Sequence, residues 1–179
     1  MHITMVAFSG RIASGKSSFA GGLARALDWP CASFGDFLRH QAAQGFLESN
    51  RPSLQQLGEE WISLGIAPFC DAVLKYVNWT AGSSVVVDGV RHLAVAEYLK
   101  SLARGSLFLV FVDTEEHVRA ERAGTRGENA AEWEQVEAHS TEAQWALLRS
   151  AADLRLDGTL AIDEAVARVR EAIEPPRDS

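Results

Sequence analysis

The size and charge of the chain describe an acidic protein with room for one folded domain. It has 179 residues, of which 47% are hydrophobic and 23% are charged, a balance typical of a globular domain. Its formal net charge of -7 argues against a general nucleic-acid-binding protein, which needs a basic face to neutralise phosphates. A small phosphorylated substrate fits, because a few well-placed arginines are enough to bind it.

The cysteines and the first residues bear on the compartment. Cys31 and Cys70 stand far apart and show no metal-ligand or redox spacing, so we interpret them as small, partly buried hydrophobic residues. Without a disulfide framework, the chain fits a reducing cytosol, and we expect a cytoplasmic protein. The first residues, MHITMVAF, contain no basic leader, and no apolar run is long enough to span a membrane. We therefore expect neither a membrane nor a nucleic acid as partner.

Predicted strands and helices alternate along the chain. Short apolar runs rich in β-branched residues indicate strands, and apolar residues repeated every three or four positions indicate helices. In chain order, we expect a strand at 3–8, a helix at 16–27, a strand at 31–34, helices at 36–47, 53–64 and 68–79, a strand at 85–87, a helix at 92–103, a strand at 107–112, helices at 115–123 and 132–149, a strand at 154–156 and a helix at 162–173.

This alternation predicts an α/β fold in which helices cover both faces of a parallel sheet. The strands that begin at 3, 85 and 107 are apolar throughout, as central strands buried on both faces must be. The stretch 36–80 contains no expected strand and is longer than one crossover needs. We expect it to form a helical insertion over the active-site edge of a single domain that spans residues 1–179.

The most specific motif is GRIASGKS, which has the pattern of a phosphate-binding loop (P-loop) and lies between a predicted strand and a predicted helix. Its glycines allow backbone angles at which successive N–H groups turn toward phosphate oxygens. Lys16 is expected to reach the β- and γ-phosphates of ATP, and the Ser17 hydroxyl to ligate Mg²⁺. A dinucleotide-binding loop is excluded because no G-x-G-x-x-G is present. The residues expected to bind the nucleotide are Gly10, Ala13, Ser14, Gly15, Lys16, Ser17 and Ser18.

A carboxylate follows the predicted strand at 85–87. The carboxyl ends of parallel strands line the ligand crevice, so we expect Asp88 to face Lys16 and Ser17 and to hold the Mg²⁺ shell. The alternative is a carboxylate that only caps the next helix or turn. Arg91, three residues further on, could bind a transferred phosphoryl group or could be an ordinary surface arginine.

Three segments together resemble the nucleoside monophosphate kinases, such as adenylate kinase. SFGDFLR, at 33–39, resembles their S-x-G-D-x-L-R segment, and VDGVR, at 87–91, resembles their D-G-x-x-R signature, here one residue shorter. The match is closer still to the phage-type deoxynucleoside monophosphate kinases and the dephospho-CoA kinase-like group, in which D-G-x-R precedes a helix that contains a glutamate, here Glu97. The arginines that resemble those of the family's lid are Arg119, Arg122 and Arg126.

The resemblance implies a P-loop kinase with a five-stranded parallel sheet, and it implies roles by position. Arg39 would bind the acceptor phosphate, and Asp36 would orient the acceptor or a metal-bound water. Arg91 would bridge the donor and acceptor phosphates. The catalytic residues implied are Lys16, Asp88, Arg91, Arg122 and Arg126, the last two closing over the donor from a short lid at 119–131. The substrate-binding residues implied are Phe34, Asp36, Arg39 and Arg91, with the Phe34 ring placed to stack on a base.

The predicted function is ATP-dependent transfer of the γ-phosphoryl group to a nucleoside or deoxynucleoside monophosphate. One alternative is a kinase of a hydroxyl-bearing small molecule such as dephospho-CoA, for which Asp36 is the only good candidate base. Another is a nucleotide-binding regulator that is not a kinase. The kinases are favoured, because no glutamine that could orient water stands just beyond Asp88 and arginines stand where a second phosphate would lie. The sequence identifies neither the acceptor, nor the choice between ATP and GTP, nor the oligomeric state.

Overall fold

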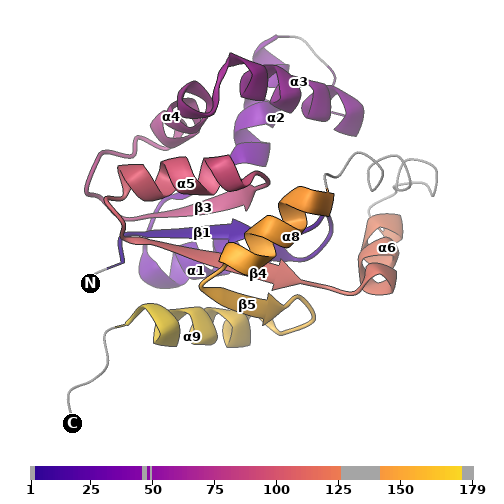
Figure 1. Ribbon diagram of the computed structural model, residues 1–179. Helices are drawn as coiled ribbons and strands as arrows, with labels where there is room; N and C mark the ends of the chain where they lie inside the picture. The colour runs from indigo at the N-terminus through magenta and orange to yellow at the C-terminus, as the bar shows by residue number, and fades with distance from the viewer. Residues whose placement is uncertain (1–2, 46–47, 49, 126–141, 175–179) are drawn as a thin grey trace.

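A five-stranded parallel sheet forms the centre of the molecule in the computed structural model, which describes residues 3–45, 48, 50–125 and 142–174 (Figure 1). The strand order is β2-β3-β1-β4-β5, so the three apolar strands are the central ones, as predicted. The strands are β1 (Met5–Ser9), β2 (Cys31–Ser33), β3 (Val85–Val90), β4 (Leu107–Asp113) and β5 (Leu154–Asp157). This arrangement confirms the predicted α/β class.

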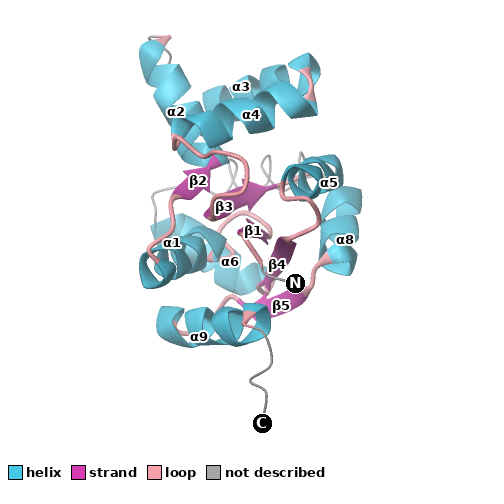
Figure 2. Ribbon diagram, turned by 90° about the vertical axis from the view of Figure 1, so that its left-hand side faces the viewer, coloured by secondary structure: helices cyan, strands magenta, loops and turns pink. Residues whose placement is uncertain are grey.

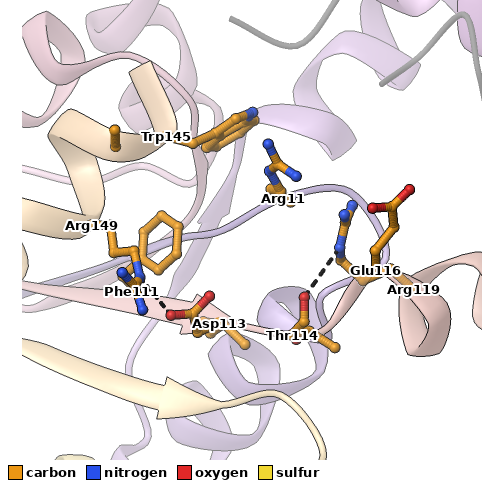
Figure 3. A pocket seen from close by; sticks show the side chains of 10 residues that line it. Arg11, Phe111, Asp113, Thr114, Glu116, Arg119, Trp145 and Arg149 are labelled. Atoms are coloured by element: carbon orange, nitrogen blue, oxygen red, sulfur yellow. Dashed lines mark hydrogen bonds and ion pairs between the residues drawn. The ribbon is translucent and has the colours of Figure 1, made fainter. Parts of the chain in front are cut away.

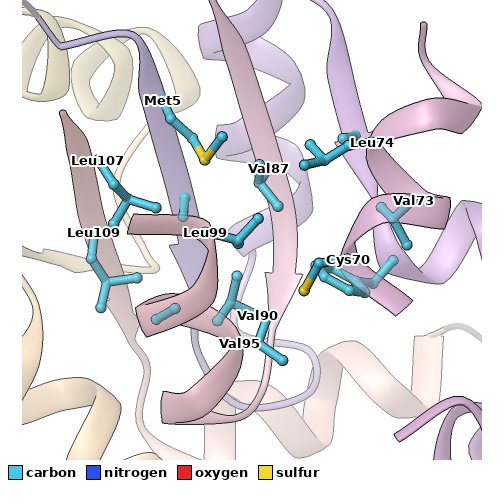
Figure 4. Close-up of a cluster of buried hydrophobic side chains, with 14 of the residues drawn as sticks. Met5, Cys70, Val73, Leu74, Val87, Val90, Val95, Leu99, Leu107 and Leu109 are labelled. Carbon is cyan, nitrogen blue, oxygen red and sulfur yellow. The ribbon is translucent and has the colours of Figure 1, made fainter. Parts of the chain in front are cut away.

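Helices cover both faces of the sheet (Figure 2). On one face, α1 (Lys16–Leu27) and α9 (Ile162–Ile173) pack over a core that contains Val86 and Val110. On the other face, α5 (Leu93–Leu102) and α8 (Glu142–Ala151) pack over a core that contains Met5, Val87 and Leu109 (Figure 4). Successive strand residues point to opposite faces, so a strand covered on both sides must be apolar at every position.

Three helices connect β2 to β3 along the chain, and Figure 1 shows them beyond the edge of the sheet. They are α2 (Phe34–Gln44), α3 (Arg51–Leu64) and α4 (Ile66–Tyr76), and they occupy the stretch for which we predict a helical insertion. The Ser33 hydroxyl accepts a hydrogen bond from the Asp36 amide (3.2 Å) and caps α2, and the Asn50 side chain caps α3 in the same way. The cap at Ser33 ends the predicted strand one residue early, because Phe34 already belongs to the helix. Leu47, where this helix was predicted to end, lies outside the described residues.

The remaining differences from the predicted elements are at strand and helix ends. β3 extends to Val90, so Asp88 lies within the strand and not after it. Helix α6 (Glu116–Thr125) follows β4, and α8 (Glu142–Ala151) covers the described part of the helix predicted at 132–149 and continues to Ala151. Positions 126–141, and with them Arg126 and the end of the predicted lid, lie outside the described residues. Within the described part of the chain, no helix has the length and apolar character needed to cross a membrane.

Candidate active site

The segment from Gly10 to Gly15 connects β1 to α1 and has the backbone of a tight loop. Three residues have positive φ: Gly10 at 146°, Ala13 at 59° and Gly15 at 96°. Ala13 therefore adopts the left-handed conformation that a glycine would accept without strain. Gly15 is the N-cap of α1, and among the described residues neither a capping side chain nor an acidic residue occupies the first turn of this helix. The positive end of α1 is therefore available to an anion.

The side chain of the motif's lysine, Lys16, reaches back to the start of the loop. Lys16 is buried, and its Nζ donates a hydrogen bond to the Arg11 carbonyl oxygen at 3.2 Å. Ser17 and Ser18 are exposed on the first turn of α1. A side chain at Gly10 would come within 2.6 Å of the Val112 carbonyl oxygen, so the close approach of the loop to β4 requires glycine there. The structure thus brings the predicted nucleotide-binding residues together in one loop.

The outer side of the loop is held by groups from two other segments. The Ser14 carbonyl oxygen accepts hydrogen bonds from Thr114 Oγ1 (2.9 Å) and from Arg122 Nη1 (3.2 Å). The Arg122 guanidinium also reaches the carbonyl oxygens of Ala13 (3.4 Å) and Gly158 (2.8 Å). We expected Arg122 to close over the donor from a lid. In the structure the guanidinium is bonded to the backbone of the loop and of the segment after β5, and its closing over the donor stays a prediction.

Asp88 lies on the strand next to the one that carries the loop. β3 pairs with β1, with Asp88 opposite Phe8, and the side chain is 7% exposed. One carboxylate oxygen, Oδ2, accepts a hydrogen bond from Ser33 Oγ (3.3 Å), whereas Oδ1 is buried and has no hydrogen-bond partner in the part of the chain that the structure describes. The N-cap position of the next helix, α5, is His92 and not Asp88. The structure therefore does not support the alternative in which Asp88 is a helix cap.

A bulge follows Asp88 in the sheet. The pairing of β1 with β3 shifts register after Phe8, so that Ser9 lies opposite Val90, and Gly89 takes a φ of 94°. The Ser9 hydroxyl donates a hydrogen bond to the Val90 carbonyl oxygen at 2.7 Å and fixes this geometry. Arg91 comes directly after β3 and is exposed, at the same edge of the sheet. The bulge thus separates a buried carboxylate from an exposed arginine within four residues.

The residues predicted to bind the acceptor begin helix α2. Asp36 and Arg39 form an ion pair with each other, and their side chains are 61% and 54% exposed. Ser33 connects this turn to Asp88, because its hydroxyl accepts from the Asp36 amide and donates to the Asp88 carboxylate. Both charged side chains remain open to a ligand, and they stand at the start of the helical insertion.

The position of Phe34 differs from its prediction. We expected its ring to stack on the base of an acceptor nucleotide. Phe34 is instead 6% exposed, and its ring packs edge-on against Phe69 with the ring centroids 4.9 Å apart. Because it directly follows the capping residue Ser33, its side chain turns into the core between the sheet and the insertion. Its ring stabilises the attachment of the insertion and leaves no face for a base.

The structure also adds residues that sequence reasoning missed. A cavity of about 290 Å³ opens beside the start of α1, and its lining includes Arg122, Gly158, Leu160 and Ile162. A side chain on Gly158 would overlap both Thr114 Oγ1 and the Ser14 carbonyl oxygen, so only glycine permits this contact. The available signal was position: DGTL directly follows the strand predicted at 154–156, and the carboxyl ends of all parallel strands lie at one edge of the sheet.

Burial and neighbouring charges shift the pKa values of two side chains near this edge of the sheet, Cys31 and His92. Burial, with the negative charges of Asp88 and Asp36, raises the pKa of the Cys31 thiol to about 11. Burial and the neighbouring Arg91 lower the pKa of His92, so the imidazole is neutral at pH 7. Within the described residues, no group of three or more His, Cys, Asp or Glu side chains could hold a metal ion by itself.

The sheet order, the loop between β1 and α1 and the buried Asp88 define a P-loop fold of the kinase type. The chain belongs to the family described as AAA domain (AAA_18), whose family model matches residues 6–142. A curated relative, a UPF0200/UPF0201 protein of Archaeoglobus fulgidus, is 28% identical over 97% of this chain. The chain spans 56% of the length of that relative.

Solved structures with this fold include several small-molecule kinases. Shikimate kinase from Acinetobacter baumannii, in complex with shikimate, matches with a TM-score of 0.65 and 11% identity, over 96% of this chain and 93% of that one. The APS kinase of Mycobacterium tuberculosis, in complex with AMPPNP and APS, matches with a TM-score of 0.58 and 20% identity, over 97% of this chain and 99% of that one. These similarities confirm the predicted fold class.

Proposed function

We propose that this protein is an ATP-dependent phosphotransferase that moves the γ-phosphoryl group to a small anionic acceptor, with nucleoside and deoxynucleoside monophosphates as the leading class. The observation that carries the proposal is the unpaired Oδ1 of Asp88, buried on the strand beside the phosphate-binding loop. A buried carboxylate oxygen without a hydrogen bond is costly in a structural role. It is useful where a metal ion or a metal-bound water completes its shell.

The donor nucleotide would occupy the loop and the cavity beside it. Lys16 would contact the β- and γ-phosphates, and the amides of the loop would bind the phosphate oxygens. The cavity next to α1 combines the apolar side chains of Phe19, Leu160 and Ile162 with the guanidinium of Arg122. A flat guanidinium stacks well on an aromatic ring, so the base of the donor fits this place.

The residues present suit Mg²⁺. Mg²⁺ takes hard oxygen ligands, and it is usually held by one or two protein groups together with phosphate oxygens and waters. The Ser17 hydroxyl on the first turn of α1 and the unpaired oxygen of Asp88 provide such donors, so these two residues would hold it. The ion would neutralise charge on the transferred phosphoryl group.

The acceptor would lie between this edge of the sheet and the helical insertion. Arg39 and Asp36 stand exposed at the start of α2, and Arg91 follows the bulge after Asp88. Phosphoryl transfer needs positioning and charge neutralisation more than covalent chemistry, so arginines around a bound phosphate suit the task. Arg126 and the lid at 119–131 remain part of this proposal.

A hydroxyl-bearing acceptor is the second candidate. Two observations support it: the Asp36 carboxylate is exposed beside the proposed acceptor site, and the solved structures with this fold include kinases named for shikimate and APS. A hydroxyl acceptor needs a group that accepts its proton, and the exposed Asp36 carboxylate could do so.

A coupled ADP-release screen tests the proposal. It would compare all nucleoside and deoxynucleoside monophosphates with dephospho-CoA, shikimate and gluconate, each with ATP and Mg²⁺, and Lys16→Ala would be the blank. Release stimulated by a monophosphate supports the first candidate, and release stimulated by a hydroxyl compound supports the second. ATP binding without release for any acceptor would contradict the kinase proposal and leave a nucleotide-binding protein.

A further inference from the structure

A second cavity, of about 340 Å³, lies at the carboxyl end of β4 (Figure 3). This cavity is distinct from the one beside α1, because no described residue lines both of them. Its polar lining comes from the phosphate-binding loop, from β4 and from helices α6 and α8. The charged and donor side chains among the described lining residues are Arg11, Asp113, Thr114, Glu116, Arg119, Trp145 and Arg149.

Trp145 lines this cavity, and its ring nitrogen has no hydrogen-bond partner among the described residues. Trp145 is 6% exposed, and Nε1 is itself buried. In Figure 3 the nitrogen lies on the side of the ring that faces Arg11. An indole N–H can only donate, and a buried donor without an acceptor is unfavourable. The group that completes this site must therefore bring an oxygen atom that accepts a hydrogen bond.

The charges around the cavity favour an anion. Among the described residues its lining has three arginines and two carboxylates, an excess of positive charge in a chain whose formal net charge is -7. Asp113 is already engaged, because its Oδ2 forms an ion pair with Arg149 Nε at 2.6 Å. Arg119 is 1% exposed and is held by a hydrogen bond from its Nε to the Thr114 carbonyl oxygen at 3.2 Å. Arg119 and Arg149 are thus held in place at the wall of the cavity.

We propose that this cavity is an oxyanion subsite for the acceptor, in which the Trp145 indole N–H donates to a phosphate or carboxylate oxygen. Its assignment to the acceptor rests on the proposed function, because Arg11 of the phosphate-binding loop forms part of its wall. A cavity with a few fixed polar groups selects ligands by the positions of their polar atoms. Trp145 therefore selects acceptors that carry an anionic group over neutral ones.

The direct test uses the indole N–H signals in a proton–nitrogen NMR spectrum. The protein is first saturated with AMPPNP and Mg²⁺ to fill the loop, and then titrated with inorganic phosphate, with acetate, and with sodium chloride at equal ionic strength. The chain has five tryptophans, so the Trp145 signal is assigned by Trp145→Phe, or by replacing the other four if that variant does not fold. Trp29, which packs against the core on the opposite face of the sheet, is the internal control.

We expect phosphate or acetate to move the Trp145 signal downfield in a saturable manner, with the Trp29 signal unchanged. Movement with phosphate alone identifies a phosphate-bearing acceptor, and movement with acetate identifies a carboxylate. The shift should persist in Lys16→Ala, in which the loop has lost its main phosphate contact. An unmoved Trp145 signal with both anions, or equal movement with sodium chloride, overturns the proposal.

A kinetic test separates this proposal from the general one. For an acceptor found in the ADP-release screen, Trp145→Phe should raise the acceptor KM about tenfold and leave the KM of ATP unchanged, since one hydrogen bond to an anion is lost. Trp29→Phe should change neither constant. An indole signal that moves in a protein without kinase activity would keep the anion site and reject the kinase. Activity with an unchanged acceptor KM in a folded Trp145→Phe variant would reject the subsite alone.

Discussion

Arg122 Nη1 donates a hydrogen bond to the Ser14 carbonyl oxygen at 3.2 Å, although the two residues are 108 positions apart in the chain. The same guanidinium binds the Gly158 carbonyl oxygen at 2.8 Å, so one side chain joins the phosphate-binding loop to the segment after β5. Ala13, whose carbonyl oxygen it also reaches, holds a left-handed backbone at φ 59°. A non-glycine residue in this conformation carries a strain of about 1–2 kcal/mol, which neighbouring contacts must offset.

Arg122→Ala should therefore loosen the loop as well as remove the proposed contact to the nucleotide base. We expect ATP affinity to fall about tenfold or more, because the carbonyl oxygens lose a charged donor whose hydrogen bonds contribute about 1.5–3 kcal/mol each. Calorimetric titration with Mg²⁺ and AMPPNP measures the effect. Arg168→Ala, which removes an exposed arginine paired with Glu164, is the control. Equal affinities of the two variants would show that Arg122 does not position the loop.

Gly158→Ala tests the contact between the last loop and the phosphate-binding loop. The added methyl group would overlap the Ser14 carbonyl oxygen, which belongs to the backbone and cannot turn away. We expect a lower melting temperature and weaker ATP binding. Gly124→Ala is the matched control, because a methyl group at Gly124 meets no atom within 4 Å and alanine favours the helix. Normal ATP binding by Gly158→Ala would show that the two loops move independently.

Asp88→Asn should damage turnover more than nucleotide binding. The amide keeps the shape and the contact with Ser33 but loses the charge that would support Mg²⁺. Charge stabilisation that matters mainly in the transition state lowers kcat, and we expect a loss of at least a hundredfold with little change in ATP affinity. Steady-state kinetics over a range of Mg²⁺ concentrations provides the measurement. Full activity with an unchanged Mg²⁺ dependence would make the carboxylate purely structural.

Arg39→Ala should affect the acceptor and spare the donor. The side chain is exposed, and its ion pair with Asp36 contributes at most about 1 kcal/mol to stability, so the variant should fold normally. Loss of a charge-assisted contact to an anion should raise the acceptor KM by about one to two powers of ten. ATP affinity, measured in the same preparation, should not change. An unchanged acceptor KM would remove Arg39 from the proposed acceptor site.

The buried thiol of Cys70 should make stability fall at high pH. Burial, with the nearby charge of Asp71, raises the pKa of this thiol from 9.0 to about 12. In the unfolded chain the thiol loses its proton near pH 9, whereas the folded chain keeps it. The contribution is therefore complete below pH 9 and is lost as the pH rises from 9 toward 12. Denaturant unfolding should show a steeper loss between pH 9 and 11 in the wild type than in Cys70→Ala, and parallel curves would contradict this.

Much of the fold could be predicted from local patterns in the sequence. Helix α1 and helix α9 have the predicted bounds, because amphipathic spacing, Gly15 before α1 and Pro175 shortly after α9 are local signals. The apolar strands β1, β3 and β4 could be predicted as central, since only strands covered on both faces lack polar positions. GRIASGKS identified the loop because its chemistry depends on glycines and a lysine at fixed spacing.

The tertiary structure decided how side chains from distant segments meet. The sequence could not place Arg122 on the backbone of the loop, because the pattern of arginines in α6 does not reveal which one faces inward. The burial of Phe34 follows from the cap at Ser33 and the packing against Phe69, neither of which is a local pattern. The unpaired Trp145 nitrogen and the unpaired Asp88 oxygen appear only when every neighbour is known. Hydrogen-bond satisfaction depends on contacts across the fold, whereas secondary structure depends largely on residues a few positions apart.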